Sequence, residues 1–142
     1  MAKPRRILTA LVACIALALL AGPHAARAAQ PTIEIIALPH SPVQNALKPV
    51  REFLGTLGAR VNVVELDAES PAGEKRLHAV GLKGHVPILL LIDGSSRFKR
   101  ADGTAVEFKD FPAKTENPIG LNGSWTVSDF EAAVNAALGA RK

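Results

Sequence analysis

The sequence predicts an α/β fold in which a central mixed sheet is covered by helices on both faces. Short β-branched, apolar runs alternate with segments of helical periodicity. A hairpin signal and a final amphipathic segment follow the third apolar run. The order strand, helix, strand, helix, strand implies parallel strands, with a C-terminal hairpin and a terminal helix completing the domain.

The first strand and the helix after it have the clearest local signals. Thr32 to Leu38 reads TIEIIAL between two prolines and predicts a mostly buried strand. An apolar stripe at helical spacing predicts a helix over Pro42 to Gly58. Ser41-Pro42-Val43-Gln44 is typical of a capping box with Ser41 as the N-cap, and Pro49 predicts a kink because it lacks a backbone donor.

The later elements are shorter, and each is bounded by residues typical of turns or helix caps. The sequence predicts strands at Val61 to Leu66 and Pro87 to Ile92, a helix from Ser70-Pro71 to about Val80, a hairpin of Arg97 to Lys99 with Ala105 to Phe108, a loop over Pro112 to Gly123, and a final helix over Thr126 to Leu138. The third of the predicted strands is apolar on both faces, which favours a central place in the sheet. Thr126-Val127-Ser128-Asp129 predicts a second capping box.

The N-terminal 28 residues read as a secretory signal. Met1 to Arg6 is basic, Ile7 to Leu20 is an apolar stretch of 14 residues, and small residues at Ala26 and Ala28 suit a cleavage site. We expect cleavage before Ala29, which leaves a single domain at residues 29–142 in an extracytoplasmic compartment, periplasmic or secreted. The alternative is a retained anchor, in which case the membrane is contacted only through this segment.

The only cysteine, Cys14, lies in this leader. Leu11 to Cys14 fits a lipoprotein box, but the apolar stretch continues after it, which argues against lipidation. After cleavage the protein has no thiol, so it forms no disulfide and carries out no thiol-disulfide exchange. The sequence therefore excludes a disulfide oxidoreductase as the mature product.

Composition argues against a nucleic-acid partner. The formal charge of +4 comes from Lys3, Arg5, Arg6 and Arg27 in the leader, and the remainder has 13 basic and 13 acidic residues. Five Phe, one Trp and no Tyr offer few surfaces on which bases stack.

Several segments resemble the thioredoxin fold. Gly81 to Leu91 is similar to the family's stretch that carries a cis-proline and enters the third strand, with one extra residue. Placing Pro49 on the kink proline of the family's first long helix puts Ser41-Pro42-Val43-Gln44 on its Cys-Gly-Pro-Cys motif. The resemblance covers about Thr32 to Leu138, and it implies that Pro87 is cis and that a binding cleft lies beside it.

This chain departs from the family at the residues that carry redox chemistry. Ser41 and Gln44 replace the two cysteines, and Ile35 takes the place of the buried acid. The family's redox activity therefore does not carry over. The fold of the family implies a cleft formed by His40, Ser41, Gln44, His85, Val86 and Pro87, because the loop before the first long helix faces the cis-proline loop.

Three readings of this cleft remain open. The first is a binding module for exported proteins or peptides, in which Val86 presents its backbone to an extended chain. The second is a metal-binding protein that uses His40 and His85, with no other cofactor. The third is a glutathione-using or hydrolytic enzyme with Ser41 at a helix N-terminus and a histidine as base. Each of these residues also has a purely structural reading, as a cap or as a histidine bonded to a loop carbonyl.

Other residues of interest are also ambiguous. His78 is expected at the surface of the second helix. Arg97, Lys99 and Arg100 form a basic cluster that is typical of a solvated strand face. Trp125 either offers a ligand platform or seals the base of the final helix.

Overall fold

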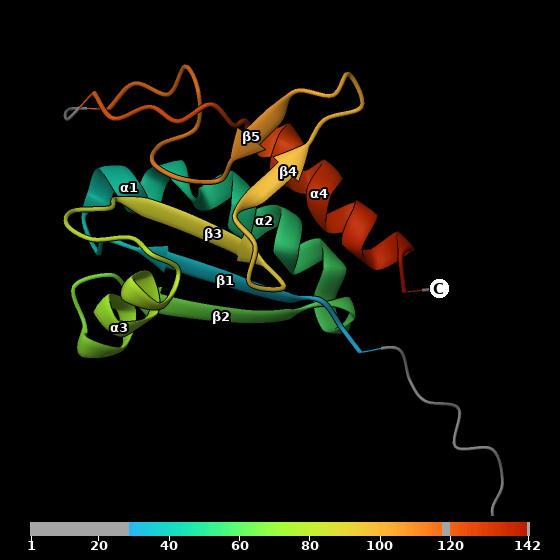
Figure 1. Cartoon of the computed structure of the whole chain (residues 1–142), viewed down its shortest axis with the longest axis horizontal. Helices are drawn as coiled ribbons and strands as arrows, with labels where there is room; N and C mark the ends of the chain where they lie inside the picture. The colour runs from blue at the N-terminus through green and yellow to red at the C-terminus, as the bar shows by residue number, and fades with distance from the viewer. Residues whose placement is uncertain (1–28, 118–119, 142) are drawn as a thin grey trace, which may run out of the picture.

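The computed structural model describes residues 29–117 and 120–141, and it is a mixed α/β structure (Figure 1). The predicted leader lies outside the described residues, so its cleavage and function stay predictions. In chain order the elements are β1 (Thr32–Ala37), α1 (Ser41–Ala46), α2 (Lys48–Leu57), a 3-10 turn (Gly58–Arg60), β2 (Asn62–Asp67), α3 (Pro71–Ala79), β3 (Ile88–Ile92), β4 (Arg97–Lys99), β5 (Ala105–Glu107) and α4 (Val127–Gly139). Across the described part of the chain, no helix has the length and apolar character needed to span a membrane.

The three longest strands form one sheet in the order β2-β1-β3. β1 is parallel to β2, with Ala37 beside Asp67, and antiparallel to β3, with Ala37 beside Ile88. The expectation of parallel strands is therefore correct for β2 and wrong for β3. The reason is the connection: α3 is only about 14 Å long, and the loop over residues 80–87 returns the chain to the end of the sheet where α3 began.

The far side of β3 is covered by the chain that follows the hairpin. The Leu90 amide donates to the Phe108 carbonyl at 2.9 Å, and the Asp110 amide donates to the Ile88 carbonyl at 2.8 Å. β4 and β5 themselves form a separate antiparallel pair, at the place where the sequence predicts a hairpin. β3 is thus flanked on both sides, and its first four residues are buried.

The long helix predicted over Pro42 to Gly58 is divided into α1 and α2 at Leu47. Pro49 explains the break, since it has no N–H to bond to the Asn45 carbonyl and its ring crowds that turn. Leu47 is completely buried at the junction. The kink predicted from Pro49 is confirmed, and it is sharp enough to end one helix and start another.

One of the two predicted capping boxes is present, and a side-chain cap is also found at Ser70, where the sequence predicts the start of a helix. The Ser70 side chain accepts a hydrogen bond from the Gly73 amide, and Thr126 and Asp129 form a complete capping box. The cap predicted at Ser41 is wrong, because α1 begins at Ser41 itself and its N-cap residue is His40, with no side-chain bond. The reason is that the Gln44 side chain reaches past the helix to the Leu38 carbonyl at 2.7 Å and not to the cap.

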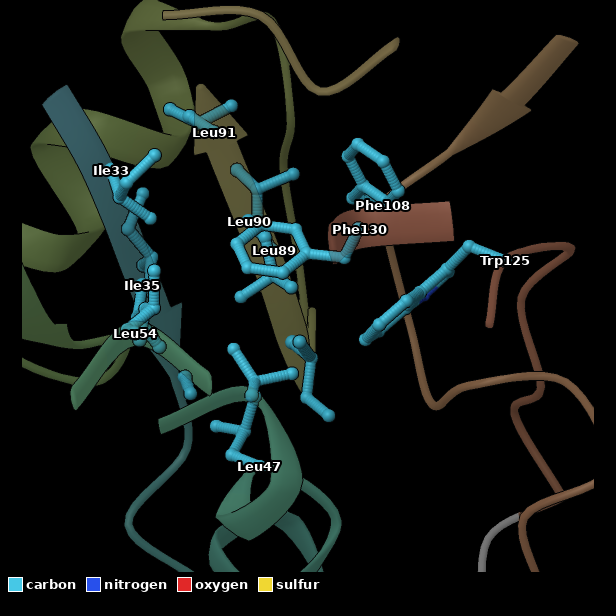
Figure 2. Close-up of a cluster of buried hydrophobic side chains, with 14 of the residues drawn as sticks. Ile33, Ile35, Leu47, Leu54, Leu89, Leu90, Leu91, Phe108, Trp125 and Phe130 are labelled. Carbon is cyan, nitrogen blue, oxygen red and sulfur yellow. The ribbon is translucent and has the colours of Figure 1, made fainter. Parts of the chain in front are cut away.

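The two faces of the sheet are covered by different helices (Figure 1). Glu34 of β1 pairs with Arg76 of α3, so alternate residues of β1 face α3. Ile33 and Ile35 point to the opposite face, toward Leu54 of α2 (Figure 2). α2 and α4 pack side by side on that face.

The core extends from the sheet to the aromatic side chains near α4 (Figure 2). The Phe108 ring makes edge contacts with Trp125 at 5.8 Å and with Phe130 at 5.4 Å between ring centroids. Trp125 is completely buried, and its indole Nε1 donates to the Lys109 carbonyl at 3.1 Å. It seals the base of α4, so the structural reading of this residue is confirmed.

Candidate functional site

A cavity of about 380 Å³ lies where β1 ends, β3 begins and α3 starts. Its apolar walls are buried side chains from four consecutive parts of the fold: Leu38, Ala68, Leu77 and Val86. The volume is within the range of sites that hold a small molecule or one large side chain. The sheet, α3 and the loop before β3 together hold it open.

Charged and titratable side chains surround this apolar floor. The residues lining the rim are Glu69, Glu74, His78, Lys83 and His85. His40 lies just outside, with its Nε2 atom 3.8 Å from the Glu69 carboxylate, and both side chains are half exposed. An exposed pair of this kind is worth little stability, so the rim is free to exchange such contacts for those of a ligand.

One wall of the cavity is formed by the loop residues 83–86. The residues Lys83, Gly84, His85 and Val86 make no backbone hydrogen bond to any other residue in the ranges 29–117 and 120–141. The β1–β3 ladder ends just beyond, where the Leu38 amide donates to the Pro87 carbonyl at 3.0 Å. Gly84 has a φ of 85°, which turns the chain sharply at this point. The segment therefore offers several free N–H and C=O groups beside an apolar cavity.

The Val86–Pro87 bond is trans, because the described residues contain no cis peptide bond. The cis assignment implied by the resemblance is wrong. Pro87 is buried and continues the antiparallel ladder of β3, so it forms no wall of the cavity. Val86 does line the cavity, and its backbone makes no hydrogen bond to other backbone groups of the described residues.

His40 and His85 lie at the same end of the sheet. β1 ends and β3 begins at this end, and the last ladder bond there joins the Leu38 amide to the Pro87 carbonyl. Both side chains are exposed. In the part of the chain that the structure describes, no group of three or more His, Cys, Asp or Glu side chains is arranged to hold a metal ion.

Ser41 and Gln44 do not join this cavity. Ser41 is exposed in the first turn of α1. Gln44 lines a second cavity of about 300 Å³ on the opposite face of the sheet, where its Oε1 atom accepts from Arg51 at 2.9 Å. Arg51 also donates three hydrogen bonds to Glu65 of β2. Gln44 is therefore part of a structural network that ties α1 and α2 to the sheet.

The strongest ion pairs are also structural. The Arg100 guanidinium binds the Asp129 carboxylate through two bonds of 2.7 Å. This pairing with Arg100 outweighs the effect of burial and, with help from Thr126, lowers the pKa of Asp129 to about 2. Arg76 makes a matching pair with Glu34, and the hydrogen bond to Glu34 raises the pKa of Arg76.

The other members of the predicted basic cluster, Arg97 and Lys99, are exposed on the hairpin, as the solvated-face reading expects. Arg100 is half-buried and forms the ion pair with Asp129.

The sequence did not point to four rim residues of the cavity: Glu69, Glu74, His78 and Lys83. The sequence does contain information about the position of Glu69. Glu69 lies just after the end of β2, and His85 lies just before the start of β3. Once β3 is known to be antiparallel to β1, the end of β2 and the start of β3 fall at the same end of the sheet. His78 is exposed, as expected, but it faces this cavity.

Compared with family models, with curated proteins and with solved structures, the chain gives no match.

Proposed function

We propose that this chain is a thioredoxin-like protein without dithiol chemistry, and that it binds extended peptide segments of exported proteins at the cavity beside Lys83 to Val86. The sheet order β2-β1-β3, with β1 parallel to β2 and antiparallel to β3, supports the fold assignment. The Phe108 to Asp110 segment beyond β3 stands where the fold requires a fourth strand. The helices are distributed as that fold has them, with α3 on one face and α2 and α4 on the other.

Loss of redox chemistry follows from the sequence. The positions that the resemblance assigns to the two cysteines hold Ser41 and Gln44, and the chain has no cysteine after Cys14. Exchange needs a thiolate as the attacking group. The activity proposed for this end of the sheet is therefore binding without thiol-disulfide exchange.

The observation that carries the proposal is the unpaired backbone of Lys83 to Val86. An extended peptide laid along this segment gains main-chain hydrogen bonds in the manner of an added strand. Such bonds depend little on the peptide's sequence, so they suit a protein that recognises many partners. Because the free groups belong to a segment already joined to the sheet at Pro87, little ordering is required on binding.

The cavity provides the selectivity that backbone bonds lack. A peptide side chain that points toward Val86 enters a space walled by Leu38, Ala68 and Leu77. Burying a leucine-sized side chain there is worth about 1.5 to 3 kcal/mol. The carboxylates of Glu69 and Glu74 at the rim favour a peptide with a basic residue next to the apolar one.

The location of the protein belongs to the same proposal. The basic, apolar and small-residue parts of residues 1–28 direct the chain out of the cytoplasm. Its partners are then other exported polypeptides, met while they are extended and before they fold. The binding described requires no cofactor.

A binding measurement with a defined peptide tests this function. The probe is an acetylated, amidated nonapeptide of alternating valine and lysine with a central leucine, labelled for fluorescence anisotropy. We expect saturable binding, and replacement of the central leucine by glycine should weaken it about tenfold or more, since roughly 1.4 kcal/mol corresponds to a factor of ten. Equal affinity for both peptides would overturn the role of the cavity.

Matched variants of the protein complete the test. Ala68→Leu fills the cavity from one of its walls and should weaken probe binding about tenfold. Ala79→Leu makes the same change at an exposed position near the end of α3 and should leave binding unaltered. The unfolding midpoint of each variant, followed through the buried Trp125, shows that the fold is kept. Undiminished binding by a folded Ala68→Leu variant would contradict the proposal.

A further inference from the structure

The outer edge of β2 is an open strand edge. Within the described residues β2 pairs only with β1, and Figure 1 shows it at the border of the sheet. The amides of Asn62 and Ala68 bond to Pro31 and Ala37 on the β1 side, so even-numbered residues of β2 turn their backbone groups inward. The backbone N–H and C=O groups of Val63 and Glu65, which alternate with these residues, point outward, away from β1. Natural proteins usually protect such an edge from pairing with another chain.

This edge carries apolar side chains where protective charges are expected. Val63 and Val64 are 41% and 36% exposed, and in the described part of the chain only Leu121 is a comparable exposed hydrophobic residue. The two valines lie on opposite faces of the sheet because their side chains alternate. An unpaired backbone with apolar residues at its centre is suited to accept another strand.

We propose that the β2 edge binds the β2 edge of a second copy of this chain, antiparallel, with the two-fold axis passing at Val64. Val64 then faces Val64 of the second copy, and Val63 pairs with its Glu65. This register places the outward backbone groups of Val63 and Glu65 opposite one another, which an antiparallel ladder requires. The central valines form the closer, non-hydrogen-bonded pair.

The charges at the two ends of β2 favour antiparallel pairing of two copies of the chain. Arg60 precedes β2, and Asp67 and Glu69 lie at its other end, with all three side chains exposed. An antiparallel two-fold arrangement brings the basic end of each strand to the acidic end of the other, twice. A parallel arrangement would place like charges together.

Glu65, the other acidic residue of β2, already forms an ion pair within its own chain. Glu65 accepts three hydrogen bonds from Arg51 of its own chain, at 3.0 and 3.2 Å from Nε and at 2.9 Å from Nη2. The two Glu65 side chains therefore approach each other as ion pairs and not as bare charges. Because a single pair of strands buries little surface, the dimer is of the weak, concentration-dependent kind.

Disulfide trapping tests the register directly. The full chain carrying Cys14→Ser has no other thiol, whether or not its leader is removed, so Val64→Cys adds the only one. Facing residues of a non-hydrogen-bonded pair lie about 4.5 Å apart at Cα, within the span that a disulfide bridges. We expect rapid formation of a covalent dimer under mild oxidation.

Val63→Cys, in the same Cys14→Ser background, is the matched control. The axis at Val64 separates the Cα atoms at position 63 of the two copies by roughly 8 Å, which is beyond the reach of an unstrained disulfide. The Val63→Cys variant should therefore cross-link at least about tenfold more slowly than Val64→Cys.

Sedimentation equilibrium of variants without cysteine gives a second readout. Val64→Glu should weaken self-association at least about tenfold, and Arg60→Glu should weaken it by a similar factor, while monomers keep their unfolding midpoint. Equal cross-linking rates at positions 63 and 64, or self-association unaffected by Val64→Glu, would overturn the proposal, as would a chain that stays monomeric at millimolar concentration. Arg60, Val63 and Val64 do not line the peptide cavity, so anisotropy with the valine-lysine probe on Val64→Glu and Arg60→Glu separates failure of the dimer from failure of the proposed function.

Discussion

Arg100, at the end of β4, holds the carboxylate of Asp129 in the first turn of α4 through two parallel bonds of 2.7 Å. The same carboxylate accepts from the Thr126 amide at 2.8 Å and completes the capping box. One side chain thus caps the helix and anchors the hairpin to it. Asp129 is also the one buried charged side chain among the described residues.

This arrangement makes stability depend on pH in acid. The pKa of Asp129 is about 2 in the folded protein, lowered from 3.8 first by the bond to Arg100. A carboxyl whose pKa is lowered by folding contributes stability that is fully present above about pH 4 and is lost as the pH falls toward 2. Asp129→Asn should lower stability at pH 7 and flatten this pH dependence. Urea unfolding at several pH values between about 2 and 5 measures both effects.

The control for that experiment lies on the same helix. Glu131→Gln removes a carboxylate of α4 without touching the Arg100 pair, so it should retain the steep loss of stability below about pH 4. An Asp129→Asn variant with the same acid sensitivity as the unmodified protein would show that the pair with Arg100 is not responsible.

The pair between Glu34 and Arg76 is expected to stabilise the contact of α3 with the sheet. Its bonds are 2.6 and 2.7 Å, and the Glu34 side chain is only 13% exposed. Arg76→Ala leaves that carboxylate without its partner and should cost about 2 kcal/mol, less than for a fully buried pair because Arg76 is partly exposed. Replacing both residues by leucine should recover most of the loss. Chemical denaturation of the single and double variants measures this, and a double variant as unstable as Arg76→Ala would contradict it.

Two glycines inside helices should respond in opposite ways to alanine. A Cβ atom at Gly73 would lie 2.0 Å from the Asp67 carbonyl oxygen, whereas one at Gly55 meets nothing within 4 Å. Gly73→Ala should therefore destabilise the protein by about 3 kcal/mol. Gly55→Ala should stabilise it by about 0.5 to 1 kcal/mol, because alanine favours a helix more than glycine does. Thermal unfolding of the two variants decides it, and a similar effect of both would mean that α3 does not approach β2 this closely.

Two serines at helix starts provide a further comparison. Ser70 Oγ accepts from the Gly73 amide at 3.1 Å, so Ser70→Ala should cost about 1 kcal/mol. Ser41 is not a cap, and Ser41→Ala should change stability by less than about 0.5 kcal/mol. Urea unfolding of the two variants measures both costs. A cost at Ser41 equal to that at Ser70 would restore the capping box that the sequence suggests.

Local patterns predicted most of the fold. The strands around Ile35 and Leu90, the kink at Pro49 and the capping box at Thr126 all depend on residues close together in the chain. The direction of β3 was not predictable in the same way, because it depends on where the loop over residues 80–87 returns. The periodicity of a strand contains no information about its orientation.

The resemblance placed some of the cavity's residues at the right end of the sheet and misplaced others. His85 and Val86 line the cavity and His40 lies beside it, as expected, but Gln44 turns to Arg51 on the other face of the sheet. The error at Gln44 arose because a side chain that can complete a capping box can equally bond to a distant carbonyl. Glu74 was missed because it joins the cavity only through the packing of α3, and Glu69 because its place beside His85 depends on the antiparallel direction of β3.

The most direct test of the peptide-binding function is an NMR titration of the ¹⁵N-labelled protein with the valine-lysine nonapeptide. The amides of Gly84, His85 and Val86 make no backbone hydrogen bond within the described residues, so pairing with a peptide should shift their resonances downfield and slow their exchange with solvent. Intermolecular NOEs should join Val86 to the peptide backbone and Leu77 to the central leucine. Unchanged resonances at these three amides under saturating peptide, or shifts confined to β2, would contradict the account.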